Sequence, residues 1–522
     1  MPDPQPARPA ATDGPPRDLE ALLGSLPACR RHGPGGPVPI TGLAAHTLQV
    51  RNGSLFACIP GSEQDGHRFA PAAVAAGAAA LLVERFLPEL ADVPQAEVAD
   101  VRGALAGLAR AFHGHPDRRL QILAVTGTNG KTTTAFMLQA ILAAAGRPAA
   151  LFGTVCYRLP GRELPAPLTT PDAVTLQALL AEAAAAGAAA AVLEASSHAL
   201  AQQRLEGLEV DTAIFTNLTQ DHLDYHGTPM AYLAAKRRLF EARGGCKPHP
   251  ALAVICSDGA AGRLIARRVA GREVVRFGFG PRAEVWGRYR PDGAGGALAV
   301  RGPWGRGELR LPLPGAHNAQ NALAALAAAL ANGIPLETAA RALQHLPPVP
   351  GRFEPIEAGQ DFRVVVDFAH NPDGLRQALW TARRQCGGGT LRLVFGCKGD
   401  DGDGGKRRRM GQIAARLADA VYLTTDDPHR EDPARIAAQV ELGLGDGGAR
   451  YCRLLDRRAA IRQAVQDAEA GDFILVAGRG HERHQPTVLG RLPFDDRAEC
   501  RQALLERPHA KPAAQLQLSA PG

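Results

Sequence analysis

The sequence lacks several features that would mark a membrane or secreted protein. No apolar run approaches the roughly 20 residues of a membrane span, because the alanine-rich segment 183–193 is short and bounded by Glu182 and Glu194. The N-terminal segment, MPDPQPARPAATDGPPRD, has no apolar core and therefore does not resemble a signal peptide. We expect a flexible Pro-rich tail there, no membrane span, and a cytoplasmic protein.

Paired cysteines and clustered aromatic residues are also absent. The nine cysteines form no CxxC pair and no metal-binding spacing, which indicates reduced thiols in a reducing compartment. Aromatic residues make up 5% of the chain and do not accompany the scattered basic residues behind the net charge of +7. This mild excess suits anionic small substrates better than a nucleic acid. We therefore expect no nucleic-acid partner.

The chain is organised around the segment QILAVTGTNGKTTTAFMLQAILAAAG, which begins at Gln121. Its apolar, β-branched run 122–125 predicts a buried strand, 127–131 a tight loop, and 132–145 a helix. Glycines in the loop let backbone N–H groups approach an anion, and the helix N-terminus adds partial positive charge. Lys131 adds a full charge, and the Thr132 hydroxyl can reach a metal ion on the phosphates. The segment therefore predicts a nucleoside triphosphate site.

The string TGTNGKTTT is similar to the loop of the Mur ligases and the folylpolyglutamate synthases, which are ATP-dependent amide-forming enzymes. NLTQDHLDYHG resembles the signature of the MurE-type Mur ligases almost letter for letter. NGSLFACIPGSEQDGHRF resembles their uridine-nucleotide domain, and AGRGHE resembles their GKGHE string. Because the resemblance covers nearly the whole chain, about 18–505, the sequence is identified as a member of the MurE-type ligases.

This resemblance, together with alternating strand and helix patterns, implies an α/β protein of three-domain Mur ligase architecture. The central domain would hold a P-loop and a parallel sheet, and the C-terminal domain would be Rossmann-like. The expected parts are a disordered tail (1–17), an N-terminal UDP-binding domain (18–115), a central ATP-binding domain (116–350), a C-terminal amino-acid-binding domain (351–507) and a second disordered tail (508–522).

The resemblance also assigns the residues for ATP and Mg²⁺. Glu194 follows the apolar strand pattern AAAVL, where an acidic residue can hold magnesium. The family's lysine at the position of Lys236 carries a carbamate, which turns a cation into a carboxylate-like metal ligand. The implied metal ligands are Thr132, Glu194, His222 and carbamylated Lys236, and the implied catalytic residues are Lys131, Glu194, His222, Lys236 and Arg352. The implied ATP-binding residues are Gly127, Thr128, Asn129, Gly130, Lys131, Thr132, Thr133, Asn321, Arg352, Asp367 and His370.

The same resemblance assigns the two other substrates. Arg204 can pair bidentately with a carboxylate or phosphate. Arg407 suits the α-carboxylate of an amino acid, and Glu482 suits a distal ammonium. The implied residues for UDP-MurNAc-dipeptide are Thr47, Thr169, Thr170, Ser196, Gln202 and Arg204, and those for the amino acid are Arg407, Asp426, Asp427, His429, Gly478 and Glu482.

The string TTDDPHRED departs from the family pattern. Enzymes that use meso-diaminopimelate typically carry DNPR here, with the arginine on the second carboxylate, whereas this chain has Asp426, Asp427, Pro428 and His429. A histidine cannot make the same two-pronged contact. Lysine or ornithine is therefore at least as well supported as diaminopimelate.

The function implied is the ATP-dependent addition of a diamino acid to UDP-MurNAc-L-Ala-D-Glu in peptidoglycan precursor synthesis, with Mg²⁺ as cofactor and an acyl phosphate as intermediate. We expect a monomer. A MurF or folylpolyglutamate synthase-like ligase is one alternative, although DHLDYHG and GRGHE speak against it. A non-catalytic nucleotide-binding scaffold is another, opposed by the presence of Lys131, Glu194, His222 and Lys236.

Overall fold

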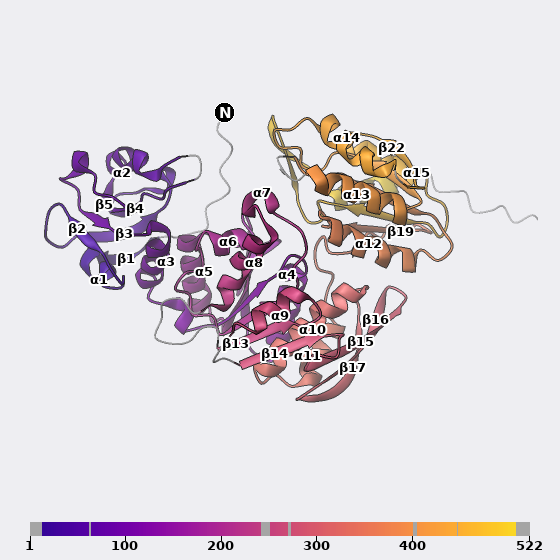
Figure 1. Cartoon of the computed structure of the whole chain (residues 1–522), viewed down its shortest axis with the longest axis horizontal. Helices are drawn as coiled ribbons and strands as arrows, with labels where there is room; N and C mark the ends of the chain where they lie inside the picture. Colours follow the sequence, from indigo (N-terminus) through magenta and orange to yellow (C-terminus); the bar gives the residue numbers. More distant parts are fainter. Residues whose placement is uncertain are drawn as a thin grey trace, which may run out of the picture. The chain divides into compact units, whose positions relative to one another are not determined.

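The structure is a computed structural model that describes residues 13–61, 64–241, 251–269, 273–399, 404–445 and 447–507 (Figure 1). The expected tails at 1–12 and 508–522 lie outside this range. The chain divides into two compact units, Met1–Pro347 and Pro348–Gly522. The expected boundary at 350/351 lies close to this division, while the one at 115/116 falls inside the first unit. No helix in the described ranges is long and apolar enough to cross a membrane.

The first sheet of the N-terminal unit has six strands in the order β1-β3-β4-β5-β6-β2, with β3 to β6 parallel. Residues 13–17 were expected in the tail, but they lie in β1, which pairs antiparallel with β3. The elements are β1 (Asp13–Asp18), α1 (Leu19–Leu23), β2 (Arg30–His32), β3 (Pro39–Ala44), η1 (Thr47–Gln49), β4 (Ser54–Ala57), η2 (Gly66–Phe69), α2 (Ala70–Ala75), β5 (Ala78–Val83), η3 (Pro88–Leu90), β6 (Gln95–Glu97), α3 (Val101–Phe112) and η4 (Pro116–Arg118).

The second sheet has eleven strands in the order β10-β9-β8-β11-β7-β12-β13-β14-β15-β16-β17. Its strands are β7 (Gln121–Thr126), β8 (Ala149–Phe152), β9 (Cys156–Leu159), β10 (Arg162–Pro165), β11 (Ala190–Glu194), β12 (Thr212–Phe215), β13 (Leu252–Cys256), β14 (Glu273–Gly278), β15 (Val285–Asp292), β16 (Gly295–Gly302) and β17 (Gly305–Leu311). The strands from β8 to β15 in this order are parallel, as predicted, because helices cross between most of them. An antiparallel meander, β15-β16-β17, extends one edge.

Helices cover this sheet and close its core. Helices α4 and α10 pack against each other, and α5 packs over the apolar side chains of β7 and β8. The helices are α4 (Lys131–Ala144), α5 (Ala173–Ala185), α6 (Ser197–Ala201), α7 (Leu223–His226), α8 (Pro229–Arg237), η5 (Arg238–Phe240), α9 (Ala260–Ala266), α10 (Ala316–Ala331) and α11 (Leu336–Gln344). The central strand β7 is therefore buried, and its carboxyl end opens into the phosphate loop.

The C-terminal unit is a doubly wound sheet in the order β18-β19-β23-β20-β21-β22, parallel except for β18 (Figure 1). Leu391, Leu393 and Phe395 of β20 face α12, α13 and α14, while Val394 faces α15 and α16. The elements are β18 (Glu354–Pro355), β19 (Arg363–Asp367), α12 (Pro372–Gln385), β20 (Leu391–Phe395), α13 (Gly404–Leu417), β21 (Ala420–Leu423), α14 (Pro433–Leu444), β22 (Arg450–Arg453), α15 (Arg457–Gln466), β23 (Phe473–Ala477), β24 (His484–Thr487), β25 (Gly490–Pro493) and α16 (Asp496–Glu506). The predicted α/β fold class is confirmed.

Candidate functional site

The phosphate loop lies between β7 and α4, as the sequence predicted. Gly127 and Gly130 have φ values of 151° and 88°, and a Cβ on Gly130 would collide with the side-chain oxygen of Asn321. Only glycine fits this backbone without strain. Asn321, predicted to lie near the nucleotide, is therefore placed against the loop by α10.

The loop is held from β12 by residues that the sequence reasoning missed. The N–H of Thr128 donates to the carbonyl of Asn217 at 2.9 Å, and the N–H of Asn129 donates to its side-chain oxygen at 3.0 Å. The hydroxyl of Thr216 donates to the carbonyl of Asn129 at 2.7 Å. Polar residues directly after the apolar strand β12 were the available signal, because parallel strands end at one edge of a sheet.

Two lysines converge on one carbonyl of this loop. Lys131 donates through Nζ to the carbonyls of Gly127 and Thr128, both at 2.9 Å. Lys236, on α8, is 1% exposed, and its Nζ donates to the same Gly127 carbonyl at 2.7 Å. Burial and the nearby charge of Lys131 lower the pKa of Lys236 well below its usual value. The interior therefore favours the neutral amine of Lys236 and places it beside the phosphate loop.

Glu194 is buried at the end of β11 and is surrounded by neutral donors. Its carboxylate accepts hydrogen bonds from the Thr132 hydroxyl at 3.0 Å, the Thr154 N–H at 2.8 Å and the Thr154 hydroxyl at 2.9 Å. The carboxylate thus stands directly beside the first turn of α4. Carboxylate and hydroxyl oxygens are the ligands that Mg²⁺ prefers, so the donor set of Thr132 and Glu194 fits magnesium.

His222 lies in a cluster of rings beside Lys236. It has a φ of 53°, its side chain is 42% exposed, and its ring centroid lies 6.2 Å from that of Tyr232. Lys236 Nζ lies 4.4 Å from the ring centroid of Tyr232, and the Tyr232 hydroxyl donates a hydrogen bond to the Thr128 hydroxyl at 3.2 Å. His198, which the sequence reasoning did not single out, lies 4.8 Å from His222 between ring centroids. The rings connect His222 and Lys236 to the phosphate loop.

The residues predicted for the peptide substrate gather around Thr170. Its hydroxyl donates to the Glu194 carbonyl at 2.6 Å and accepts from the Ser196 N–H at 3.1 Å. Arg204 donates to the Thr170 carbonyl at 2.8 Å and, through two nitrogens, to the Gln202 side chain at 3.0 and 2.6 Å. The hydroxyl oxygen of the neighbouring Thr169 lies 3.2 Å from that of Thr154. Thr47 lies on η1, which connects β3 and β4 of the six-stranded sheet.

Three further residues predicted for ATP lie together in the C-terminal unit. The guanidinium of Arg352 lies 4.4 Å from the ring centroid of Phe368. Asp367, at the end of β19, accepts from the Phe353 N–H at 2.7 Å and the Ala369 N–H at 2.9 Å. Burial raises the pKa of Asp367, and Arg352 opposes that rise. His370 contacts the Phe368 carbonyl at 2.8 Å, so one aromatic residue links Arg352 and His370.

Arg407, predicted for an α-carboxylate, is engaged within its own unit. Its guanidinium donates to both oxygens of Glu431 at 2.7 Å, to Gln439 at 3.0 Å and to the carbonyl of Lys398 at 2.8 Å. The side chain is only 3% exposed. Arg407 thus fixes the backbone of Lys398 at the end of β20.

The other residues predicted for the amino acid separate into two places. Asp426, Asp427 and Glu482 lie together, with one oxygen of each within 4.8 Å of the others. Gly478 adjoins them, because a Cβ there would collide with Asp426. His429 instead lines a cavity of about 730 Å³ together with Arg430, Arg457 and Phe494.

Lys398 and Arg479 bring positive charge to the three carboxylates, and the sequence reasoning assigned neither residue. Lys398 Nζ lies 3.3 Å from Asp427 Oδ2 and 3.3 Å from Glu482 Oε1. The fully buried Arg479 pairs with Asp427 and donates to the His484 carbonyl at 2.7 Å. Lys398 and Glu482 are 84 residues apart, but each follows a strand of the parallel sheet at the same edge.

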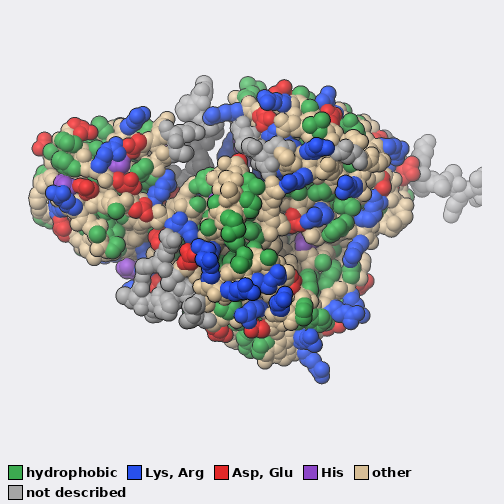
Figure 2. Space-filling view, in the orientation of Figure 1, with side chains coloured by type: hydrophobic (Ala, Val, Ile, Leu, Met, Phe, Trp, Pro, Cys, Tyr) green, Lys and Arg blue, Asp and Glu red, His purple; other side chains and the backbone are tan. Residues whose placement is uncertain are grey.

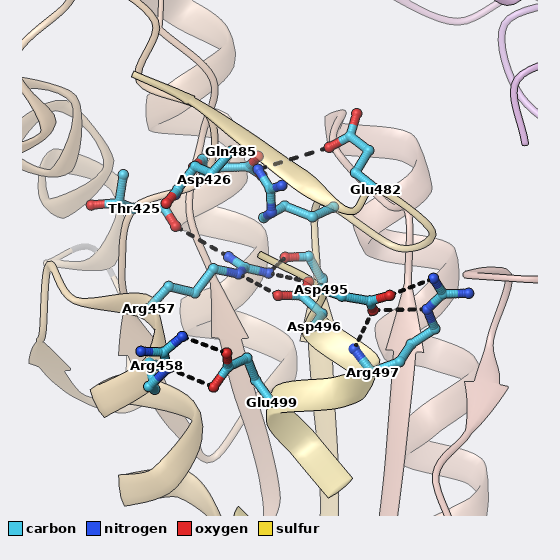
Figure 3. A network of polar contacts seen from close by, with 12 residues as sticks. Thr425, Asp426, Arg457, Arg458, Glu482, Gln485, Asp495, Asp496, Arg497 and Glu499 are labelled. Atoms are coloured by element: carbon cyan, nitrogen blue, oxygen red, sulfur yellow. Dashed lines mark hydrogen bonds and ion pairs between the residues drawn. The ribbon is translucent and has the colours of Figure 1, made fainter. Parts of the chain in front are cut away.

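The buried ion pair of Arg457 and Asp496 lies next to this cluster (Figure 3). Arg457 donates two hydrogen bonds of 2.7 Å to Asp496 of α16, one of 3.0 Å to the Ala477 carbonyl and one of 3.3 Å to the Thr425 carbonyl. Figure 3 shows Arg457 between Asp496 and the Thr425–Asp426 segment, with the Arg458–Glu499 pair beside it. Arg457 therefore fixes the backbone that carries Asp426 and Asp427.

We expect Arg457→Leu to lower the free energy of unfolding of the C-terminal unit by about 3–5 kcal/mol, since it leaves the Asp496 carboxylate buried without its partner. Arg458→Leu is the matched control. Arg458 forms an equally short pair with Glu499 at 2.7 Å. Its own side chain is 48% exposed, although that of Glu499 is 10% exposed, so we expect a loss smaller than that of Arg457→Leu. Urea unfolding followed by tyrosine and tryptophan fluorescence measures both losses, and equal losses would contradict the role of Arg457.

The face of the molecule drawn in Figure 2 carries charges of both signs. Figure 2 shows Lys and Arg side chains scattered over the viewed face, with Asp and Glu side chains among them. The described cysteines are all unpaired thiols. The features that do converge are the buried strand β7, the glycine loop, Lys131 and the Thr132–Glu194 pair. Together they define a P-loop nucleotide-binding protein of the α/β class.

Comparisons with known proteins identify the family within this class. Three family models match the chain: "Mur ligase family, catalytic domain" at residues 39–113, "Mur ligase middle domain" at 125–329, and "Mur ligase, glutamate ligase domain" at 351–480. The chain belongs to the Mur ligase family.

Similar proteins include the UDP-N-acetylmuramoyl-L-alanyl-D-glutamate–2,6-diaminopimelate ligase of Geobacillus kaustophilus, 42% identical over 94% of this chain and 99% of that protein. The protein of the same name from Gloeobacter violaceus is 42% identical over 90% of this chain and 95% of its own length. A solved structure of a protein with that name is 34% identical, with a TM-score of 0.64 over 89% of this chain and 95% of its own. A MurF structure from Acinetobacter baumannii, at 21% identity and a TM-score of 0.62, shares the fold.

Proposed function

We propose that this Mur ligase adds meso-diaminopimelate to UDP-MurNAc-L-Ala-D-Glu in the cytoplasm, with hydrolysis of ATP. The observation that carries the proposal is the convergence of Lys131, Lys236 and the Thr132–Glu194 pair on the phosphate loop. The relatives that are about 42% identical over nearly their whole length are named as UDP-N-acetylmuramoyl-L-alanyl-D-glutamate–2,6-diaminopimelate ligases. Identity of that extent favours this activity over a MurF-type one, for which the likeness lies in the fold.

The residues around the loop are suited to managing phosphate charge. Backbone N–H groups of the glycine loop, the N-terminus of α4 and Lys131 would neutralise the β- and γ-phosphates. Thr132, Glu194, His222 and a carbamylated Lys236 would hold Mg²⁺, which when bound polarises the phosphoryl oxygens. A carbamate would supply oxygen ligands where the buried amine of Lys236 now stands.

The reaction needs no nucleophile from the protein. The γ-carboxylate of the D-glutamyl residue would attack the γ-phosphorus of ATP and release ADP, giving an acyl phosphate. The amine of the diamino acid would then attack the acyl carbon, and the tetrahedral intermediate would expel phosphate. Arg204 and Gln202 would orient the dipeptide. In support, Arg204 donates to Gln202 and to the Thr170 carbonyl, and the Thr170 hydroxyl donates to the carbonyl of Glu194 at the carboxyl end of β11. The work of the site is therefore positioning and charge stabilisation.

A phosphate-release assay with ATP, Mg²⁺ and UDP-MurNAc-L-Ala-D-Glu tests this proposal. We expect release only when an amino acid is also present, with meso-diaminopimelate giving a higher kcat/KM than L-lysine or L-ornithine. Omission of the amino acid is the control, because an acyl phosphate has no acceptor without it. Equal release without the amino acid, or no release with any of the three, would contradict the proposal.

A further inference from the structure

Lys398 lies on the solvent-exposed side of the carboxylate cluster. Arg479 is fully buried and Asp427 is 4% exposed, whereas Lys398 and Glu482 are 25% and 24% exposed. These two oppositely charged groups lie 3.3 Å apart. An incoming ligand would therefore meet a cation and an anion side by side.

Such a pair is complementary to a zwitterion. A ligand that carries an ammonium and a carboxylate on one carbon can place the ammonium on Glu482 and the carboxylate on Lys398, so both protein charges keep a partner. A ligand that carries an ammonium alone would compete with Lys398 for Glu482. Lys398 would keep only Asp427 as a partner, and the two cations would lie close together. Like charges at this separation repel, most strongly where water is scarce.

The charges around Lys398 keep it protonated for this purpose. Burial lowers the pKa of Lys398, but the carboxylates of Glu482 and Asp426 outweigh that effect and raise it above its usual value. Two hydrogen bonds hold its backbone: Arg407 donates to the Lys398 carbonyl at 2.8 Å, and the Gly399 N–H donates to the Asp427 carbonyl at 2.7 Å. Lys398 therefore favours its charged form and extends from a backbone held by hydrogen bonds.

The same two cations argue against a metal ion in the acidic cluster. Asp426, Asp427 and Glu482 have ligand atoms close enough to surround an ion. Lys398 and Arg479, however, already contact two of these carboxylates, and a divalent cation would have to displace or approach them. The arrangement fits an organic ligand with its own charges.

We propose that Lys398 is a specificity-determining residue that receives the distal carboxylate of a diamino dicarboxylic acid and repels a diamino acid that lacks it. This inference rests on the proposed function and deepens it. 2,6-Diaminopimelate carries an ammonium and a carboxylate at each end, whereas lysine and ornithine carry only an ammonium at the distal end. Lys398 would thus supply the positive charge that His429, which lines the cavity of about 730 Å³, does not bring to the cluster.

The test compares kcat/KM for meso-diaminopimelate and for L-lysine in the full-length enzyme. Lys398→Gln is expected to lower the ratio of the two values about tenfold or more, mainly through a higher KM for diaminopimelate. Lys398→Arg keeps the cation and is expected to keep the ratio within about threefold. Arg409→Gln is the matched control, because it removes an exposed cation from α13, and its ratio should equal that of the wild type.

A second test compares two ligands in the wild-type enzyme, so its main result does not depend on whether a variant folds. The distal monoamide of meso-diaminopimelate lacks the carboxylate charge, so we expect its KM to exceed that of the acid about tenfold or more, and the difference to vanish in Lys398→Gln. Equal use of acid and amide by the wild type would overturn the inference. The inference would also be overturned if Arg430→Gln lowered the ratio of kcat/KM for diaminopimelate to that for lysine and Lys398→Gln did not. A wild type that turns over none of the amino acids would instead overturn the proposed function, and the Lys398 assignment with it.

Discussion

Lys131→Met is expected to lower kcat about a thousandfold and to weaken ATP binding. The ammonium of Lys131 is the one full charge on the phosphate loop itself, and removal of a donor that stabilises developing charge typically costs 10²- to 10³-fold in rate. In this chain its Nζ already lies on the loop, 2.9 Å from the carbonyls of Gly127 and Thr128. Steady-state phosphate release and ATP titration would measure the two effects separately.

Arg147→Met is the control for this variant. Arg147 follows the other end of the same helix, α4, and donates to the Asn332 carbonyl at 3.2 Å. Loss of that cation should leave kcat within about twofold, since surface substitutions away from a site have small effects. A Lys131→Met enzyme with near-normal kcat would show that the loop does not carry the phosphates.

Lys236→Met is expected to reduce kcat about a hundredfold or more. A metal ion that polarises a phosphoryl oxygen contributes several kcal/mol to the transition state, and the variant would remove one of its ligands. Carbamylation requires a neutral amine, and burial together with Lys131 holds the pKa of Lys236 well below its usual value. The amine is therefore available to carbon dioxide at pH values where an exposed lysine is protonated.

The carbamate itself can be observed. Wild-type enzyme incubated with ¹³C-bicarbonate should show a carbamate carbon resonance that is absent from Lys236→Met. Arg237→Met, one residue along α8, is the matched control and should keep both the resonance and the activity, because Arg237 pairs with Glu241 at 2.5 Å away from the loop. An active wild type without the resonance would show that an unmodified lysine suffices.

The organisation around the phosphate loop could be predicted closely because strong local signals agree there. The apolar run before Gly127 and the glycines that follow indicated a strand from 122 and a helix from 132, and the structure has β7 (Gln121–Thr126) and α4 (Lys131–Ala144). The meander β15-β16-β17 was not foreseen, because glycine and arginine interrupt its alternation of apolar residues. Strand 13–18 was hidden for a related reason, since prolines made it resemble a tail.

The candidate site was predictable where one motif carries the chemistry and obscure where distant segments meet. Lys131 begins α4 and Glu194 ends β11, both at the carboxyl edge of the sheet, so the local pattern of the sequence suggested them. The contacts of Lys398 with Glu482 and of Arg457 with Asp496 join residues that lie 84 and 39 apart in the chain. Periodicity reports which face a side chain occupies, but not which other side chain it will meet there. Side-chain packing decides those partners.

The bridge from Arg457 to Asp496 has a consequence for the order of events during synthesis. Asp496 begins α16, the last helix of the described chain. Arg457, which donates to the Thr425 carbonyl, therefore gains its ion-pair partner only when α16 has been made. On the ribosome, domains form from the N-terminus onward as the chain emerges. The phosphate loop and its sheet can therefore assemble early, whereas the carboxylate cluster that we propose selects the amino acid is completed only after α16 has left the tunnel. A nascent chain would complete its phosphate loop before the cluster that is proposed to distinguish diaminopimelate from lysine.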